Sequence, residues 1–465
     1  MSTRSDAACA AARRLRDEPL LRFAGRFGPR VEQGIGDGAR LLIGDQSEIA
    51  LFPPDHASSL DHRMALLARP GDTVVTRQPA PRFAAYAQDW LGLGDVAFLS
   101  VGAGRPRPVA ALCHGDAQMR NRIAARIAGR GTPAILPYLT TGHDWRLAQV
   151  LAEAADRPVA VAGPTPLMSR RANDKLWFAA LARDVLGRDA VPPSAAAFGP
   201  AAAAGLVARM ARSADSVVVK VPDSAGSSGN IRLETAALAG LAPAGIRRLL
   251  LDRLAALGWQ GRFPLQIGVW ETGVRCSPSV QIWIPAKGPP RLDGVMEQRV
   301  LGVEGAFIGG TRAELEPALQ ERLATEGLAL ADALQRMGYV GQCSLDAILR
   351  DGGGPPELHW IECNARWGGM SIPLAVATRL AGGAAPAGFV VTQAIRPELP
   401  LIGMDAMVAR LRGLLWRDGD PATGIVVLSP PDARNGLRVN LMAMDRTAGA
   451  ARALMRRAWA RFDPA

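Results

Sequence analysis

Short apolar runs alternate with amphipathic stretches over the first 165 residues. The runs are only a few residues long and rich in Val, Ile and Leu, which predicts strands rather than helices. The stretches between them, such as HDWRLAQVLAEAA, repeat their apolar residues at helical spacing. This alternation predicts βα units and a mostly parallel sheet. The predicted strands are RLLIG, DTVVT, DVAFLSVG, PAILPYL and RPVAVAG, preceded by an Arg-rich helix with frayed ends over residues 1–30.

The pattern changes from residue 171 onward. RRANDKLWFAALARDVLG has periodic apolar residues and predicts one helix, whereas SVVVKV predicts a strand. The loop PDSAGSSGN separates this strand from IRLETAALAGL, which we predict to be a second helix. Two antiparallel neighbouring strands and a long helix are then predicted in PLQIGVWE, SPSVQIWIP and EPALQERLATEGLALADALQRMG.

The last third of the chain predicts more strands. GQCSLDAILR and ELHWIECNARW are separated by DGGGPP, and AGGAAPAG at 381–388 indicates a boundary or loop. The strands GIVVLSP and LRVNLMAMD and a basic final helix predict a small α+β C-terminal domain. A chain of this length fits about three domains. We predict them at 1–170, 171–385 (with lobes of about 171–268 and 269–385) and 386–465.

Composition narrows the classes of function. The chain has 54 basic and 43 acidic residues and a formal net charge of +11, but no block of like charges. The basic residues are dispersed, which argues against nucleic acid as the main partner and favours attraction of anionic small molecules such as ATP. No run of apolar residues approaches the length of a membrane span, and no apolar segment near the N-terminus is typical of a signal peptide. We therefore expect a cytoplasmic protein that does not associate with a membrane.

Two residue types add information. The five cysteines are scattered without a C-x-x-C pair, which argues against disulfides and a zinc site. Only three of the basic residues are lysines, namely Lys175, Lys220 and Lys287. Because an ammonium and a guanidinium are not interchangeable, each lysine in an arginine-rich chain is a candidate for a specific role. Lys287 stands in a polar loop and is predicted to be solvated.

The segment VVVKVPDSAGSSGN indicates a phosphate-binding loop. Lys220 ends a predicted strand, and Gly226 and Gly229 permit a close approach of the backbone to a ligand. Hydroxyl and backbone N–H groups could surround phosphate near the N-terminus of the predicted helix. The alternative is an ordinary flexible turn between a strand and a helix. The candidate hydroxyl donors are Ser224, Ser227 and Ser228.

A hairpin closed by DGGGPPE indicates a metal site. If the turn is symmetric about Gly354, Asp346 stands opposite Glu362, and like charges at such a position are destabilising. Asn364 shares the face of Glu362 because strand side chains alternate. Two carboxylates and an amide oxygen suit Mg²⁺, which would turn repulsion into attraction. A solvated sheet face, or a register shifted by one residue, remains the alternative.

Arginines near this hairpin are candidates for contact with a phosphoryl group. Arg366 continues the face of Glu362 and Asn364, and its guanidinium could hold a phosphoryl or carboxylate group bidentately. The alternative is a surface charge. Arg299, in MEQRV, is a weaker candidate for the same charge, with a structural salt bridge as its alternative. His359 alternates out of phase with Glu362 and is predicted to be structural.

In their order and spacing, these motifs resemble the ATP-grasp superfamily over about residues 171–375. The resemblance implies ATP between two α+β lobes, with its phosphates near Lys175 and Lys220 under the lid SAGSSGN. It implies Mg²⁺ on Asp346, Glu362 and Asn364, with Arg366 as the accompanying arginine. The hinge PLQIGVWE would read adenine through the backbone at 266–270, which includes Gln266 and Val269, and would hold ribose through Glu271.

The segment before residue 171 resembles the Rossmann-like pre-ATP-grasp domain. The whole chain is most similar to the pheganomycin-type peptide ligases, in SAGSSGN and ECNARWGG. This resemblance implies an ATP-dependent carboxylate–amine ligase that forms an amide through an acyl-phosphate in natural-product biosynthesis. Its partners would be a small carboxylic acid and an amine or peptide. The alternatives are a phosphoryl transferase that forms no amide and a non-catalytic nucleotide-binding module. The oligomeric state stays open, with a homodimer as one option.

Overall fold

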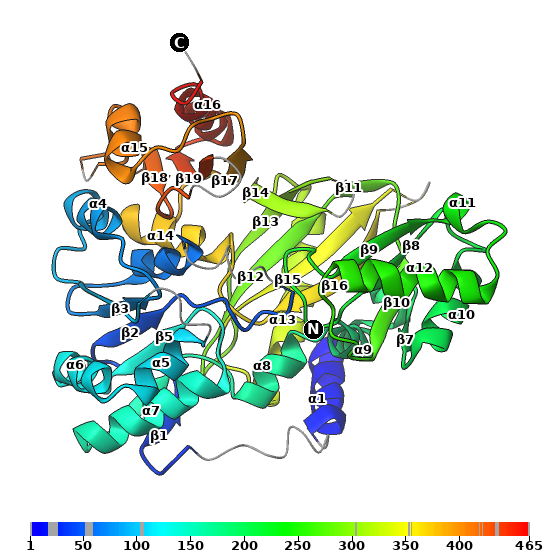
Figure 1. Cartoon of the computed structure of the whole chain (residues 1–465), viewed down its shortest axis with the longest axis horizontal. Coiled ribbons are helices and arrows are strands. Elements are labelled where there is room, and N and C mark those ends of the chain that lie inside the picture. Colours follow the sequence, from blue (N-terminus) through cyan, green and yellow to red (C-terminus); the bar gives the residue numbers. More distant parts are fainter. Residues whose placement is uncertain are drawn as a thin grey trace.

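The computed structural model describes residues 2–16, 27–51, 59–102, 107–302, 305–351, 354, 356–417, 419–420, 422–432 and 437–463. The strands in this part of the chain form three sheets (Figure 1), and each sheet begins later in the sequence than the one before it. A parallel sheet comes first, a four-stranded antiparallel sheet second, and a nine-stranded sheet last. No helix in the described ranges is long and apolar enough to cross a membrane.

The first sheet confirms the predicted parallel βα architecture. Each neighbouring pair of its strands is parallel. Helices α5 (Val109–Gly115), α6 (Ala117–Ile127) and α7 (Gly142–Ala155) share one apolar core with it. The short helix η1 (Asp61–Leu67) and α4 (Pro81–Leu91) belong to a second core. In sheet order the strands are β1 (Val31–Gln33), β6 (Val159–Val161), β5 (Ala134–Pro137), β2 (Arg40–Ile43), β3 (Thr73–Thr76) and β4 (Ala97–Ser100).

The first helix packs away from this sheet. Helix α1 (Ser2–Arg16) lies against α9 (Lys175–Leu186) and α13 (Pro317–Arg336), as Figure 1 also shows. Three of its alanines are buried in the core that those two helices share with later strands. The N-terminal helix is thus part of the second half of the structure, although the sequence pattern assigned it to the first domain. Residues 17–26 of the predicted helix lie outside the described residues.

The second sheet forms the small lobe and corrects one prediction. Residues 230–234, predicted as the start of a helix, form a strand that pairs with the strand bearing Lys220. Ile231 and Leu233 are buried while Arg232 is not, so the period of two prevails over the helical pattern. Only α11 (Thr235–Leu238) is helical. The sheet order is β7 (Ser194–Ala197), β10 (Leu265–Val269), β8 (Ser216–Lys220) and β9 (Asn230–Glu234), with α10 (Pro200–Met210) and α12 (Pro243–Ala256) beside it.

The third sheet forms the large lobe. The strands β10 and β12, predicted to be neighbours, belong to different sheets, because the chain crosses between the lobes after Val269. Strand β16 pairs only with β15 in this sheet. The other strands are β11 (Val274–Cys276), β15 (Gly341–Arg350), β12 (Pro278–Ile284), β13 (Arg291–Leu301), β14 (Ala306–Arg312), β17 (Gly388–Arg396), β19 (Leu437–Asp445) and β18 (Gly424–Val427) in sheet order, with β16 at Glu357–Asn364.

The C-terminal segment shares this sheet. The boundary predicted at residue 386 falls just before β17, but β17–β19 extend the large-lobe sheet instead of forming a sheet of their own. Their apolar side chains also join the core of η1 and α4 in the first domain. The C-terminal segment therefore connects the first domain with the large lobe. Its helices are α15 (Met404–Leu411) and α16 (Ala448–Trp459), and α14 (Ser371–Leu380) precedes it.

Candidate active site

The β15–β16 hairpin opposes two carboxylates as predicted. Asp346 pairs with Glu362 in the register of the strands. Nearer the turn, however, Arg350 pairs with Glu357, which is one residue away from the symmetric register. The register shifts between Asp346 and Ala347, where β16 holds one unpaired residue, Ile361. This β-bulge restores the predicted pairing at the site.

The bulge also corrects the prediction for His359. Beyond it the alternation of β16 is reset, so Trp360 is buried and donates to a carboxylate of α13. The imidazole Nδ1 of His359 instead lies 2.7 and 2.8 Å from the two oxygens of Glu271. Burial lowers the pKa of Lys220 and the charges of Glu362 and Glu271 oppose this shift, so His359 contacts one carboxylate of the cluster around Lys220. The predicted phase was wrong because an unbroken strand was assumed.

Burial and charge shift the pKa values of the two carboxylates in opposite directions. Burial and then the charge of Glu362 raise the pKa of Asp346 to about 6, although Ser279 Oγ donates to it at 2.6 Å. Burial also acts to raise the pKa of Glu362, but Lys175, followed by Lys220, keeps that pKa below its ordinary value. Two opposed carboxylates of this kind are destabilising unless a cation lies between them.

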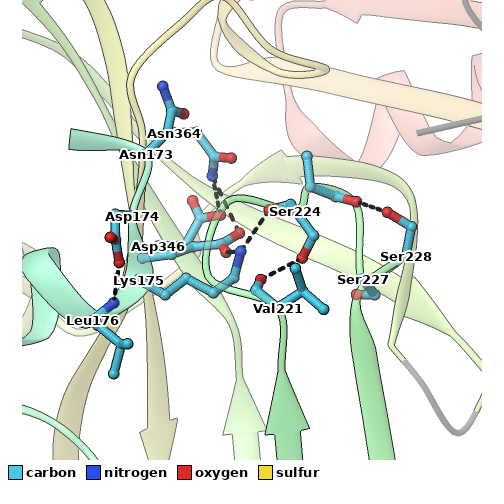
Figure 2. A network of polar contacts seen from close by, with 12 residues as sticks. Asn173, Asp174, Lys175, Leu176, Val221, Ser224, Ser227, Ser228, Asp346 and Asn364 are labelled. Atoms are coloured by element: carbon cyan, nitrogen blue, oxygen red, sulfur yellow. Dashed lines mark hydrogen bonds and ion pairs between the residues drawn. The ribbon is translucent and has the colours of Figure 1, made fainter. Parts of the chain in front are cut away.

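A break in a predicted helix positions Lys175. The stretch RRANDKLWFAALARDVLG forms two helices, α8 (Pro166–Ala172) and α9, because Asp174 caps α9 by accepting from the N–H groups of Leu176 and Trp177. Lys175 is thereby the first residue of α9. Its Nζ lies 2.8 Å from Glu362 Oε2 and donates to the Ser224 carbonyl at 2.6 Å (Figure 2).

Asn173, in the same break, was missed as a site residue. Its Oδ1 accepts from the Ala365 N–H at 3.1 Å and from the guanidinium of Arg366. Arg366 also donates to Asn364 Oδ1, so two amide oxygens hold its planar head. Asparagine occurs only six times in the chain, and this scarcity was the signal in the sequence. The structure thus joins α8, β16 and the loop after β16 around one arginine.

Lys220 lies at the end of β8, directly opposite Gln266 of β10. Burial lowers its pKa to about 8, while the charges of Glu362 and Glu271 act in the opposite direction. In contrast to Lys175, its ammonium has no hydrogen bond or ion pair within the described residues. A half-buried cation that is partly removed from water and has no partner is unfavourable. Lys220 is therefore suited to receive an anion.

The predicted lid is the turn of the β8–β9 hairpin, so no helix N-terminus follows it. Gly226 has a φ of +60°, which favours glycine, and a Cβ on Gly229 would lie only 2.2 Å from Ser224 Oγ. Ser227 shares the left-handed region with a φ of +65°. The three lid hydroxyls donate to backbone carbonyls, as Figure 2 shows in part; the acceptors are Val221 for Ser224, Gly305 for Ser227 and Ala225 for Ser228.

The predicted hinge joins the two lobes. The N–H groups of Val269 and Trp270 donate to the carbonyls of Pro193 and Ser216, so they cannot also donate to an adenine. Glu271 is buried, with a side chain only 2% exposed, and its carboxylate is held by His359. Gln266 faces Lys220 across the sheet. The ribose role of Glu271 and the adenine role of residues 266–270 stay predictions.

The structure does not bring Arg299 to the cluster. Its side chain is exposed, and no hydrogen bond or ion pair to a described residue involves it. The neighbouring Gln298 reaches Asp346 instead. Since side chains alternate along a strand, Arg299 points to the opposite face of β13 from Gln298. Lys287 is exposed, as predicted.

The residues present fit a magnesium ion. Asp346, Glu362 and Asn364 offer hard oxygen donors on one face. The Asn364 amide currently donates through Nδ2 to Asp346 at 2.8 Å and to Glu362 at 3.4 Å. It would have to turn over before its Oδ1 could bind a metal, and this turn would also release Arg366. Burial and the charge of Glu362 raise the pKa of Asp346. A divalent cation bound between these two carboxylates would relieve their repulsion.

Comparisons with known proteins agree with this architecture. Residues 61–153 match the model of the pre-ATP-grasp domain. An ADP complex of N5-carboxyaminoimidazole ribonucleotide synthetase is similar in structure, with a TM-score of 0.55 and 12% identity, covering 94% of this chain and 100% of its own. The same enzyme from Thermus thermophilus has a TM-score of 0.54 and 16% identity, covering 92% and 99%. No curated protein matches the sequence.

Biotin carboxylase from Campylobacter jejuni, in a βγ-ATP complex, is also similar, with a TM-score of 0.56 and 14% identity, covering 92% of both chains. At these identities the likeness concerns the fold. The small lobe, the large lobe and the preceding parallel sheet are the parts that the sequence predicted. The chain thus has the ATP-grasp fold, with a pre-ATP-grasp domain in front of it.

Proposed function

We propose that this protein is an ATP-dependent carboxylate–amine ligase that forms an amide through an acyl-phosphate. The main support is the convergence of the buried Lys175, the half-buried Lys220, two opposed carboxylates and an oriented arginine, drawn from α9, β8 and the β15–β16 hairpin. Two of the similar solved structures are complexes with ADP and with βγ-ATP, which supports nucleotide binding by this chain.

In this proposal the chain positions reactants and neutralises charge. Lys220 would hold phosphate oxygens with its unpaired ammonium, and Lys175 would do so after leaving Glu362. Lid hydroxyls would exchange backbone carbonyls for phosphate oxygens. Arg366, held by Asn173, would stabilise the charge that develops as a phosphoryl group passes to the carboxylate.

Asp346, Glu362 and the turned amide of Asn364 would hold Mg²⁺. When bound, the ion would supply positive charge next to the terminal phosphates. Lys175 then has a second role, because it keeps Glu362 ionised in the nucleotide-free protein.

The finer assignment concerns the substrates. We infer an amino-acid-like acid and an amino acid or peptide as amine, in natural-product biosynthesis. SAGSSGN and ECNARWGG, which resemble the pheganomycin-type peptide ligases, support this inference.

The test is ADP release by the whole chain with ATP and Mg²⁺, against pooled carboxylic acids with and without amino acids and short peptides. We expect release only with an acid and an amine together, with a new mass equal to their sum less water. Release with an acid alone would replace the ligase by a phosphoryl transferase. No binding of Mg-ATP would refute the proposal.

The affinity for Mg-ATP should fall at alkaline pH. The pKa of Lys220 is lowered to about 8 by burial, and phosphate would raise it. The protein therefore has its full affinity for Mg-ATP when the pH is below the pKa of Lys220. The affinity decreases as the pH rises above that pKa, by about tenfold at pH 9. Calorimetric titration at pH 7.5 and 9 checks this.

The control for this experiment is Lys220→Arg. A guanidinium stays charged at pH 9, so its profile should be flatter than that of the wild type. A flat wild-type profile would show that Lys220 does not contact the nucleotide as an ammonium.

A further inference from the structure

Two buried polar side chains of β12 form a relay of hydrogen bonds that ends on Asp346. Gln281 Nε2 donates to Ser279 Oγ at 2.8 Å, and Ser279 Oγ donates to Asp346 Oδ1 at 2.6 Å. Ser279 and Gln281 are each only 2% exposed. Polar groups that are removed from water in this way are normally hydrogen-bonded, and here both of these hydrogen bonds lead toward one carboxylate of the candidate metal site.

The direction of each hydrogen bond in the relay follows from Asp346. An ionised carboxylate can only accept hydrogen bonds, so the single proton of the Ser279 hydroxyl points toward it. The Ser279 oxygen must then accept the bond from Gln281, which therefore turns its NH₂ group and not its carbonyl toward Ser279. Gln281 thereby keeps the hydroxyl proton of Ser279 on the side of Asp346.

The contact between Ser279 and Asp346 is built into the sheet. Ser279 lies directly opposite Asp346 in the register of β12 and β15, so the pairing of the strands holds both side chains on one face. The ion pair between Lys175 and Glu362 is different, because it joins a helix to a strand, and in the proposed function Lys175 leaves Glu362 for phosphate. Ser279 would therefore keep its hydrogen bond to Asp346 when nucleotide is bound.

This hydrogen bond leaves Asp346 with one available oxygen. Oδ1 is engaged by Ser279, whereas Oδ2 accepts from the amide of Asn364 at 2.8 Å. When the amide of Asn364 turns over, only Oδ2 becomes free for a metal ion. A carboxylate that offers a single oxygen suits Mg²⁺, which requires near-ideal octahedral coordination with short bonds, whereas Ca²⁺ also accepts both oxygens of one carboxylate.

We propose that Ser279, oriented by Gln281, is a positioning residue that makes Asp346 a one-oxygen ligand and thereby selects Mg²⁺ over Ca²⁺. This inference rests on the proposed function, because Asp346 is there a ligand of the metal ion that accompanies ATP. Hydrogen-bond partners of metal ligands typically contribute about 10–100-fold to metal affinity. Loss of the Ser279 hydroxyl should weaken Mg²⁺ binding by about that factor, but it should change Ca²⁺ binding little, because Ca²⁺ can also bind the released Oδ1.

The experiment measures how Mg²⁺ and Ca²⁺ displace Mn²⁺ from the whole chain, by electron paramagnetic resonance of free Mn²⁺, with and without ADP. In Ser279→Ala we expect the affinity for Mg²⁺ to fall about 10–100-fold and that for Ca²⁺ to change by less than about threefold. Ser279→Thr keeps the hydroxyl and should retain the wild-type ratio. Gln281→Met lets the hydroxyl rotate and should shift the ratio in the same direction, by a smaller factor. The control Ser277→Ala, whose side chain has no hydrogen bond to a described residue, should behave like the wild type.

An unchanged ratio in Ser279→Ala would overturn the proposal, as would an equal loss of both ions or a wild type that binds no metal ion in either condition. If circular dichroism shows that Ser279→Ala does not fold, Gln281→Met decides, because an unchanged ratio in that variant counts against the relay. ADP release with pooled acids and amines is measured in parallel. A changed ratio without any ADP release by the wild type would refute the ligase and keep the role of Ser279, whereas ADP release with an unchanged ratio would refute the role of Ser279 alone.

Discussion

Replacing Asp346 by asparagine is expected to lower ADP release about a thousandfold and to make the metal-free protein more stable. Loss of one preorganised group that stabilises developing negative charge typically costs about 10²–10³-fold in turnover, and Asp346 would contribute through the Mg²⁺ that it helps to hold. Affinity for Mg-ATP should fall much less, because Lys175 and Lys220 remain. The new amide can still accept from Ser279 through its oxygen, and the amide of Asn364, which donates to Asp346 in the wild type, can turn its oxygen toward the new N–H group.

The gain in stability follows from the raised pKa of Asp346, about 6 against an ordinary 3.8. A raised carboxyl pKa means that the ionised form of Asp346 destabilises the folded state at pH 7. This penalty is complete above the folded-state pKa and disappears as the pH falls below the ordinary one. Denaturant unfolding in EDTA at pH 7 and pH 4 should therefore show a gain at pH 7 only.

The matched control is Asp332→Asn, on the surface of α13, where an exposed ion pair with Arg336 is lost. Such pairs contribute little, so both turnover and stability should stay near wild type. If Asp346→Asn retained full turnover, the opposed carboxylates would not be the metal site. If the Asp346→Asn variant were less stable than the wild type at pH 7, the inferred repulsion between Asp346 and Glu362 would be contradicted.

Replacing Lys220 by methionine is expected to weaken Mg-ATP binding about a hundredfold without loss of stability. A charge-assisted contact with phosphate in a buried site is worth roughly 2–3 kcal/mol. In the free protein the ammonium of Lys220 has no partner among the described residues, so its removal breaks no contact and ends the cost of burying a charge. Calorimetric titration with Mg-ATP and denaturant unfolding measure the two effects.

The chain offers two comparisons for this variant. Lys287→Met removes an exposed lysine and should leave binding and stability unchanged. Lys175→Met should weaken binding and also destabilise, because it leaves Glu362 without its ion pair and Ser224 without a donor. Equal loss of stability in the Lys175 and Lys220 variants would contradict the view that only Lys175 is paired before nucleotide binds.

Local pattern determined much of the fold. Short apolar runs and amphipathic stretches predicted the parallel sheet, because strand and helix periods are properties of neighbouring residues. The same reasoning failed at IRLETAALAGL, where pairing with β8 prevails over helical propensity. It also failed at RRANDKLWFAALARDVLG, which forms two helices because Asp174 caps the start of the second one. It also failed for the two strands on either side of the hinge, since periodicity does not say which sheet a strand joins.

For the candidate site, the sequence by itself predicted which side chains come together and part of their geometry. Lys220, Asp346, Glu362, Asn364 and Arg366 were identified because residue type and strand alternation fix the chemistry and the face. Only the tertiary structure decided that a bulge at Ile361 rescues the register and turns His359 toward Glu271. It alone brought Asn173 to Arg366, because contacts between distant segments depend on packing, which no local pattern encodes.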